Sequence, residues 1–232
     1  MLLPLFVAST IRHQQVRPVL WLNTAGEILI NGQKADARVN PGASKVKFAG
    51  GYAYNFSGAK PGILFGDDPR LRLGGSLSVS VWLFPRNYGS VSPQAEIMFR
   101  GDDRTGLDPY FLVITSDGTI NFAVSSEDGR AMGVQAELPL DRWTHVVGSM
   151  DDRTGELALW ENGEKVACAH TSARPFVGLD PRFSPGIGIG NVQNDHGPHN
   201  QPFNGLLADL RLFDSVVTPD EAGFPPFLSS RN

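Results

Sequence analysis

Short runs of alternating apolar and polar residues, each bounded by turn residues, recur along the whole sequence. In the clearest run, 76–84, Leu77, Val79, Val81 and Leu83 fall on one face and serines fall on the other. This period of two is typical of a strand with one buried face. The pattern therefore predicts a half-buried strand here. Comparable runs lie at 110–115, 119–124, 143–150, 157–160 and 206–213.

Turn chemistry indicates how these strands connect. Ser116-Asp117-Gly118 and the Asn162-Gly163 pair separate apolar runs in the manner of tight hairpins, and 151–155 is a longer loop that ends in Gly155. Consecutive strands should therefore pair antiparallel. Because no segment has the helical period that a crossover would need, a parallel α/β fold is excluded. Only 218–221, with Pro at a first helical position, predicts a helical turn. We expect 224–227 to lie across the surface.

Composition agrees with a chain of many short strands. The 232 residues are 41% hydrophobic and 19% charged, with 26 Gly and 17 Pro. We find no linker, repeat or shift in composition, so we predict one domain over residues 1–232, with its core at about 18–222. Net charge is −4 and basic residues are scattered, which gives nucleic acid no electrostatic footprint.

Two further features bear on location and redox chemistry. Cys168 is the one cysteine, so no intrachain disulfide forms, and its apolar run predicts a small buried hydrophobe. The apolar opening of the chain is short, lacks basic residues at its start and has an early proline. It matches neither a complete signal peptide nor a membrane span, and an edge strand or the remnant of an export signal remain open.

The order of motifs resembles the laminin-G-like domains of bacterial secreted proteins, over roughly residues 18–222. Each motif is weak alone, but the ordered set is specific. The resemblance is carried by Tyr54-Asn-Phe-Ser-Gly58, Asp67-Asp-Pro-Arg-Leu71, Ser78-Val-Ser-Val-Trp-Leu-Phe-Pro85, Ile97-Met-Phe-Arg-Gly101, Leu138-Pro-Leu-Asp-Arg-Trp-Thr-His-Val146, the 151–155 turn, Leu159-Trp-Glu-Asn-Gly-Glu164, Ile187-Gly-Ile-Gly190 and Phe203-Asn-Gly-Leu-Leu-Ala-Asp-Leu-Arg-Leu-Phe213.

This resemblance implies an all-β fold, a two-sheet antiparallel β-sandwich of the concanavalin A-like jelly-roll kind. Members bind glycans, proteins or other ligands, and many hold a calcium ion. The resemblance also implies a secreted, cell-surface or periplasmic location and no membrane span. Trp143 and His145 correspond to a strand that serves folding in the family, so we assign them to packing and hydrogen bonding.

Catalytic signatures are missing from the sequence. Retaining glycanases need two carboxylates about 5–5.5 Å apart, and the strand pattern E-x-D-x-x-E does not occur. No Gly-x-Ser-x-Gly elbow occurs either. The adjacent acid pairs 67–68, 102–103, 127–128 and 151–152 are interpreted as solvated turn acids. We predict no catalytic residue.

Calcium prefers hard oxygen ligands, which the loops at one end of a sandwich can supply. By resemblance the candidate ligands are Asp209, Asn23 and Asp36, with main-chain oxygens near Ser57. The family often has Asp where Ser57 stands, so this chain lacks one charge. The alternative is that Asp209 accepts hydrogen bonds from a loop backbone.

The segment 190–202 is unusually rich in amides and histidines. Amide groups offer paired donors and acceptors that match the hydroxyls of a sugar. The predicted ligand contacts here are Asn194, Asp195, His196, His199 and Asn200. The alternative is a polar loop whose residues cap their own backbone. A zinc site at His196 and His199 lacks a partner motif.

Aromatic rings could provide stacking platforms for sugars. All four tryptophans lie in strand-like runs, where burial is the default, but Trp160 precedes the Asn-Gly turn and could face outward near a rim. Tyr88 and Tyr110, which lie beside Gly-rich loops, are other candidates. We therefore predict a non-catalytic, lectin-like module for a glycan. The alternatives are a protein-interaction or structural domain and a glycan-cleaving enzyme with non-standard residues.

Overall fold

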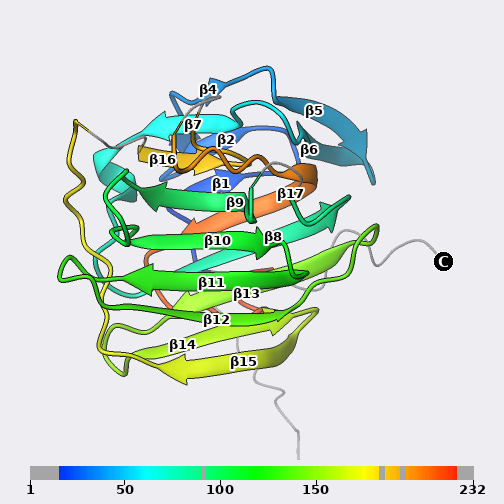
Figure 1. The fold of residues 1–232 in the computed structure, drawn as a ribbon. Coiled ribbons are helices and arrows are strands. Elements are labelled where there is room, and N and C mark those ends of the chain that lie inside the picture. Colours follow the sequence, from blue (N-terminus) through cyan, green and yellow to red (C-terminus); the bar gives the residue numbers. More distant parts are fainter. Residues whose placement is uncertain (1–15, 90–91, 183–185, 194–196, 224–232) are drawn as a thin grey trace, which may run out of the picture.

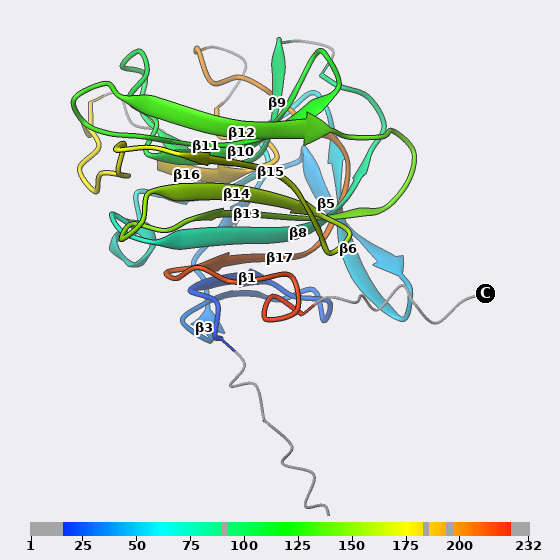
Figure 2. The same ribbon diagram turned by 90° about the horizontal axis from the view of Figure 1, so that it is seen from below.

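The computed structural model describes residues 16–89, 92–182, 186–193 and 197–223, which form two antiparallel sheets packed face to face (Figures 1 and 2). Sheet A has the strand order β15-β14-β13-β8-β17-β1-β2-β3, and the β5–β6 hairpin joins it through β17. Sheet B has the order β12-β11-β10-β9-β16-β7-β4. Non-consecutive neighbours such as β8 and β17 bring distant parts of the chain together.

The bounds of the elements follow sheet by sheet. Sheet A consists of β1 (Leu20–Leu22), β2 (Ile28–Ile30), β3 (Gln33–Lys34), β5 (Ala43–Phe48), β6 (Gly51–Ser57), β8 (Leu77–Pro85), β13 (Thr144–Met150), β14 (Glu156–Glu161), β15 (Glu164–His170) and β17 (Asn204–Phe213). Sheet B consists of β4 (Arg38–Val39), β7 (Ile63–Gly66), β9 (Gln94–Gly101), β10 (Tyr110–Thr115), β11 (Thr119–Ser125), β12 (Ala131–Glu137) and β16 (Gly186–Ile189). A short 3-10 helix spans Pro69–Leu71.

The predicted turns are confirmed. Gly118 closes the β10–β11 hairpin with its N–H on the Thr115 carbonyl and a φ of 90°. Asn162 and Gly163 both have positive φ, 50° and 91°, as the tight turn between β14 and β15 requires. Gly155 donates to the Asp151 carbonyl at 2.7 Å with a φ of 77°. Turn residues thus fix the register of the antiparallel pairs.

The main hydrophobic core lies between the two sheets and draws on both halves of the chain. The inner-facing residues of β8, from Leu77 to Leu83, meet those of β10 and β11, including Leu112 and Phe122. All of these side chains are fully buried. Burial of so much apolar surface is the dominant stabilising term of such a sandwich.

The prediction that β8 is half-buried is wrong, because its second face is covered as well. Ser78 and Ser80 are 0% and 1% exposed. The segment 214–223 lies on the outer face of sheet A, as Figure 2 shows below β17. Ser78 Oγ donates to the Ser215 carbonyl at 2.8 Å and accepts from the Val217 N–H at 3.0 Å. A distant segment therefore satisfies the polar face of the strand.

That covering segment has the local structure expected from its sequence. The N–H of Ala222 donates to the Thr218 carbonyl at 2.9 Å, which is one helical turn, and the Glu221 carboxylate accepts from both the N–H and the hydroxyl of Thr218. The Glu221 side chain thus reaches back to the first residue of the turn, which is one half of a capping box. Residues 224–227 lie outside the described residues.

Two other features differ from or extend the expectations. Cys168 is exposed, not buried, because β15 is an edge strand whose outward side chains meet solvent. Val166 on the same side is 44% exposed. Among the described residues no helix is long and apolar enough to cross a membrane.

Candidate functional site

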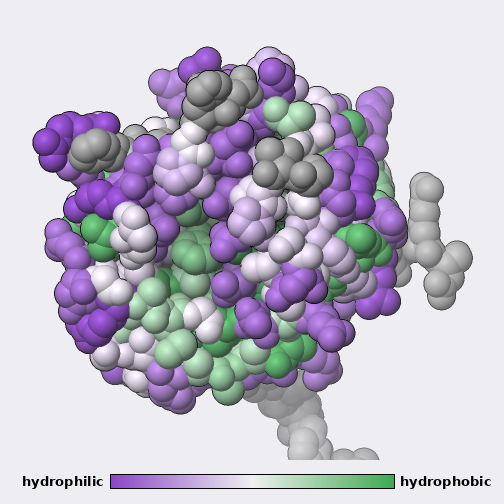
Figure 3. Space-filling view, in the orientation of Figure 1, coloured by the Kyte–Doolittle hydropathy of each residue, from purple (hydrophilic) through white to green (hydrophobic). Residues whose placement is uncertain are grey.

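The segment between β16 and β17 folds over the outer face of β9. The N–H of Val192 donates to Glu96 Oε2 at 2.7 Å, and the His199 ring packs on Phe99 with centroids 4.4 Å apart. Phe99 in turn stacks with Phe111 of β10 at 6.1 Å. Sheet B faces the viewer in Figure 3, where hydrophobic surface occupies the middle of the face and polar surface its margins.

Amide side chains hold this segment in shape. Asn191 Oδ1 accepts from the Gln201 N–H at 3.1 Å, while its Nδ2 donates to Asn200 Oδ1 at 2.9 Å. Gln193 Oε1 accepts from the His199 N–H at 2.8 Å, and Gln193 Nε2 donates to Asp103 Oδ1 at 2.6 Å. These amides therefore cap their own loop and tie it to the β9–β10 connection.

Beneath the loop lies a group of acidic residues, Glu96, Asp102, Asp103 and Asp108, which we call the carboxyl cluster. Glu96 comes from β9 and the three aspartates from the β9–β10 connection. Glu96 and Asp102 are fully buried. Buried carboxylates normally need partners, so the hydrogen bonds of each one decide what the cluster can do.

Asp102 is well satisfied. Its carboxylate accepts from the Arg104 guanidinium, at 2.6 Å for the shortest contact, and from the Asp180 N–H at 3.0 Å. Burial alone would raise the pKa of Asp102, but these hydrogen bonds outweigh it and the pKa lies below its ordinary value. Asp102 is therefore an ionised structural residue.

Asp108 is different, because its Oδ1 is buried and has no hydrogen-bond partner. Burial, and next the negative charges of Asp102 and Asp103, raises the pKa of Asp108 to about 7. The carboxyl fits only because residue 101 is glycine: a Cβ there would lie 2.2 Å from Asp108 Oδ1. The chain thus makes room for a carboxyl group that no hydrogen bond within the described residues stabilises.

Glu96 has the same feature one strand away. Its Oε2 accepts from Val192, but its Oε1 is buried without a hydrogen-bond partner. Burial, partly offset by the bond from Val192, raises the pKa of Glu96 well above its ordinary value, and the charge of Asp108 adds to the effect. The two electrostatically coupled acids therefore resist being ionised together.

His199 borders Asp102 and Asp108. Its Nε2 lies 3.0 Å from the Asp102 carbonyl and 3.7 Å from Asp108 Oδ1. Because a carbonyl can only accept, Nε2 carries a proton and donates it. Burial is the main cause that lowers the pKa of His199, so the ring is neutral near pH 7, and its Nδ1 is buried without a hydrogen-bond partner.

Residues 56–223 match the sequence model of a laminin-G family described as the concanavalin A-like lectin/glucanases superfamily. The chain belongs to this superfamily. The match covers more than half of the sequence, includes the 190–203 segment and agrees with the two-sheet antiparallel sandwich.

Curated relatives of this superfamily member are more distant. Serum amyloid P-component from Rattus norvegicus is 33% identical over 81 residues, which is 29% of this chain and 36% of that protein. Pentraxin-related protein PTX3 from Homo sapiens is 28% identical over 123 residues, 50% of this chain and 31% of that protein. The chain thus spans about a third of the length of these relatives.

Solved structures confirm the fold. The binding domain of Paraclostridial Mosquitocidal Protein 1 and that of botulinum neurotoxin serotype G each superpose with a TM-score of 0.66 at 12% identity. The superpositions cover 88% and 89% of this chain and half of each of those chains. At this identity the likeness concerns the concanavalin A-like sandwich alone.

The predicted ligand contacts do not all gather at one place. His199 and Asn200 lie in the loop over the carboxyl cluster, whereas Asn194, Asp195 and His196 lie outside the described residues. Tyr110 is 0% exposed and its hydroxyl donates to the Leu71 carbonyl at 2.6 Å, so its ring belongs to the core and offers no sugar platform.

The other aromatic candidates and His145 lie away from the loop over the carboxyl cluster. Trp160 is partly exposed but packs on Val147 at the outer face of sheet A, with the Lys165 ammonium 5.1 Å from its ring. His145 is 2% exposed and shares a 2.9 Å hydrogen bond with Ser80, in agreement with the predicted packing role. Tyr88 donates to the Leu138 carbonyl.

The four residues predicted as calcium ligands have separate surroundings. Asp209 accepts from Trp21 Nε1 at 2.6 Å and pairs with Arg211 at 2.7 Å. Asn23 is bonded to Glu27, at 2.9 and 3.0 Å. Asp36 is exposed and lies in a different hollow, beside Phe65, and Ser57 pairs with Asn204 in the β6–β17 ladder. Within the described residues no group of three or more Asp, Glu, His or Cys has the spacing of a metal site.

Sequence reasoning missed the carboxyl cluster for an identifiable reason. Asp102 was expected to be a solvated turn acid, yet it is fully buried because the 172–182 segment covers it through the Asp180 N–H. Glu96 did leave a signal, since it is a lone acid in an otherwise apolar strand run, Ala95 to Phe99. A charge at such a position is rarely buried without a role.

The two coupled acids do not form an open catalytic cleft. Glycosidases place two carboxyl groups on either side of an accessible sugar bond. Glu96 is 0% exposed and held under the backbone of Val192. A sugar could not reach it with the loop in this position.

Proposed function

We propose that this chain is a non-catalytic, lectin-like module that binds glycans on the outer face of sheet B, at the loop 190–203 over the carboxyl cluster, with the help of a calcium ion. The observation that carries the proposal is the pair of buried carboxyl oxygens, Asp108 Oδ1 and Glu96 Oε1, without hydrogen-bond partners.

The chemistry of this donor set fits calcium. A buried carboxylate without partners is destabilising, and a divalent cation would offset that cost because calcium takes six to eight oxygen ligands. Gln201 Oε1 is also buried without a hydrogen-bond partner, and the Gln201 carbonyl already accepts from the Glu96 N–H. We infer that Asp108, Glu96 and Gln201 would hold the ion beneath the loop.

The remaining residues support recognition. Phe111 is partly exposed on the same face and offers an apolar ring surface, which sugars use for stacking. Asn191, Gln193 and Asn200 keep the loop in shape through their mutual hydrogen bonds. Asn194, Asp195 and His196 remain part of the proposal as direct contacts. A secreted or cell-surface location would suit such a ligand.

A glycan array tests this function directly. Purified protein should show calcium-dependent binding to one or more polysaccharide classes in 2 mM calcium (roughly the concentration at which extracellular modules fill), and excess EDTA should remove this calcium-dependent part. Asp108→Asn should abolish the calcium-dependent part of the binding. Asp152→Asn, whose side chain is 49% exposed in the β13–β14 turn of the other sheet, is the matched control and should bind as the wild type does.

Either of two results would contradict the proposal. One is binding to no glycan class in the presence of calcium. The other is glycan binding that is equal in calcium and EDTA and unchanged in the Asp108→Asn variant, which would place recognition away from the carboxyl cluster.

A further inference from the structure

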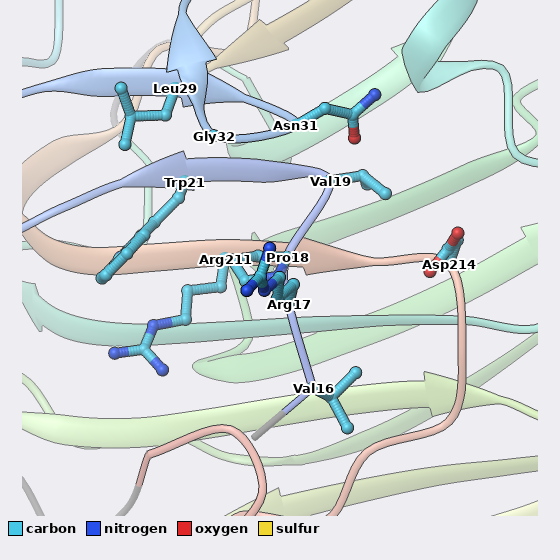
Figure 4. A pocket seen from close by; sticks show the side chains of 10 residues that line it. All are labelled: Val16, Arg17, Pro18, Val19, Trp21, Leu29, Asn31, Gly32, Arg211 and Asp214. Carbon is cyan, nitrogen blue, oxygen red and sulfur yellow. The ribbon is translucent and has the colours of Figure 1, made fainter. Parts of the chain in front are cut away.

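A hollow of about 660 Å³ opens on the outer face of sheet A, on the side of the sandwich away from the carboxyl cluster (Figure 4). Its lining includes Arg17, Trp21, Leu29, Asn31, Arg211 and Asp214. We call it the Trp21 hollow. Its size lies within the range of small-molecule sites, and its lining combines an aromatic ring with a few polar groups.

Trp21 is held firmly in this hollow. Its Nε1 donates to Asp209 Oδ1 at 2.6 Å, and Arg211 pairs with the same carboxylate while its guanidinium lies 4.9 Å from the ring centroid. Asp209 has a φ of 51° at a register irregularity of β17. Positive φ is unfavourable for such a residue, and strain of this kind concentrates at functional sites. The bulge aims the carboxylate at Trp21.

Other polar side chains around the hollow are unengaged. Arg17, Asn31 and Asp214 are exposed, and their side chains make no hydrogen bond or ion pair with any other described residue. Asn31 sits at the tip of the β2–β3 turn with a φ of 50°. Together they offer a donor, an amide and an acceptor beside the partly exposed ring of Trp21.

Charge decides which ligand fits. Asp209 neutralises Arg211, which leaves one positive charge on Arg17 and one negative charge on Asp214. An anion would be attracted by the first and repelled by the second. A neutral polyol can hydrogen-bond with both, as donor to the carboxylate and acceptor from the guanidinium.

We propose that the Trp21 hollow is a second binding site, for a neutral pyranose unit of a glycan. The sugar ring packs on the uncovered part of Trp21 and on Leu29. Arg17 donates to ring or hydroxyl oxygens, Asp214 accepts from hydroxyl groups, and the Asn31 amide does both. This site goes beyond the proposed function because it lies on the other sheet and requires no metal ion.

Saturation-transfer NMR on the full chain tests the proposal. Cellohexaose, mannohexaose and laminarihexaose are the neutral probes and hyaluronan hexasaccharide is the acidic comparison, all in the presence of EDTA. We expect saturation of the pyranose protons of at least one neutral probe and a weaker signal from hyaluronan. The tryptophan fluorescence should change over the same concentration range.

Variants assign the binding to the hollow. Arg17→Ala and Asp214→Ala should each weaken binding of the neutral probe at least tenfold without changing the melting temperature, because neither side chain has a partner in the described residues. Arg153→Ala, 88% exposed in the β13–β14 turn, is the control and should bind normally. Asp108→Asn should also bind normally.

Three results would overturn the inference. The first is no saturation transfer to any neutral probe. The second is binding by Arg17→Ala and Asp214→Ala that is as strong as that of the wild type, and the third is binding that Asp108→Asn abolishes. The last would assign the signal to the carboxyl cluster instead. If the protein shows no calcium-dependent glycan binding but keeps the EDTA-resistant signal, only the proposed function is overturned.

Discussion

The outer face of each sheet is covered by a segment from the C-terminal part of the chain. The two faces differ in whether the polar groups beneath the segment have hydrogen-bond partners. Under 214–223, the serine and arginine side chains of sheet A have partners, as in the Ser78 and Asp209–Arg211 contacts. Under the loop between β16 and β17, Glu96 of β9 and Asp108 of the β9–β10 connection each have a buried oxygen without a hydrogen-bond partner. The comparison teaches that covering a sheet can complete its structure, as in sheet A, or leave carboxyl oxygens without partners, where we propose that a ligand binds.

The largest expected difference between the two faces concerns aromatic residues. Phe213 is fully buried in the cluster under 214–223, and Phe213→Ala should lower the free energy of unfolding by about 3–5 kcal/mol. Phe111→Ala on the outer face of sheet B removes a partly exposed ring and should cost clearly less. Urea unfolding measures both. Equal losses would contradict the view that only the sheet A cover is structural.

A smaller effect is expected from the ion pair of sheet A. Arg211→Met leaves the part-buried Ala222 carbonyl without its donor and the Asp209 carboxylate with Trp21 alone, and should cost about 2 kcal/mol of unfolding free energy. Arg182→Met, in a pair whose arginine is 77% exposed, is the control and should cost at most about 0.5 kcal/mol. Similar values for the two variants would show that the sheet A network is not stabilising.

The pH dependence of stability, about 1.4 kcal/mol per pH unit for each proton, distinguishes the faces by sign. Burial, with Asp102 and Asp103, raises the pKa of Asp108 from 3.8 to about 7. Between those values the folded state holds a proton that the unfolded state has lost, so this group makes stability fall as pH rises. Burial, with Arg211, lowers the pKa of His145 from 6.5 to about 3, so this group makes stability fall as pH falls through that window.

Stability measured from pH 4 to 6.5 in EDTA should therefore respond oppositely to two variants. Asp108→Asn should make stability rise more steeply with pH than in the wild type. His145→Gln should make it rise less steeply or fall. Parallel curves for both variants would mean that neither pKa is displaced by the fold.

Much of the architecture could be predicted from the sequence because it depends on local patterns. The strand at 110–115 and the turns at Gly118, Gly155 and Asn162 follow from alternation and turn chemistry alone. The prediction that β8 is half-buried is wrong because a period of two shows only that the two faces differ in polarity. It does not show that the polar face is exposed to solvent. Ser78 of β8 is hydrogen-bonded to Ser215, which lies 137 positions away in the sequence.

The candidate site was harder to predict for the same reason. The amide-rich loop was identifiable from composition, and His199 does border the carboxyl cluster. The residues beneath that loop could not be identified in this way, because Asp102 and Asp108 have the sequence context of ordinary turn acids and only the fold buries them. Tyr110 was misassigned because its place beside a Gly-rich loop does not reveal that its side chain points into the core.

The central claim, that Asp108 is held ready for a cation, is tested most directly by thermal unfolding of the wild type and Asp108→Asn in EDTA and in millimolar calcium. The account predicts that calcium raises the melting temperature of the wild type only, and that the variant is the more stable protein in EDTA because a neutral amide tolerates burial better than an unpartnered carboxylate. Identical melting temperatures of the wild type with and without calcium, together with a variant that is less stable in EDTA, would contradict it.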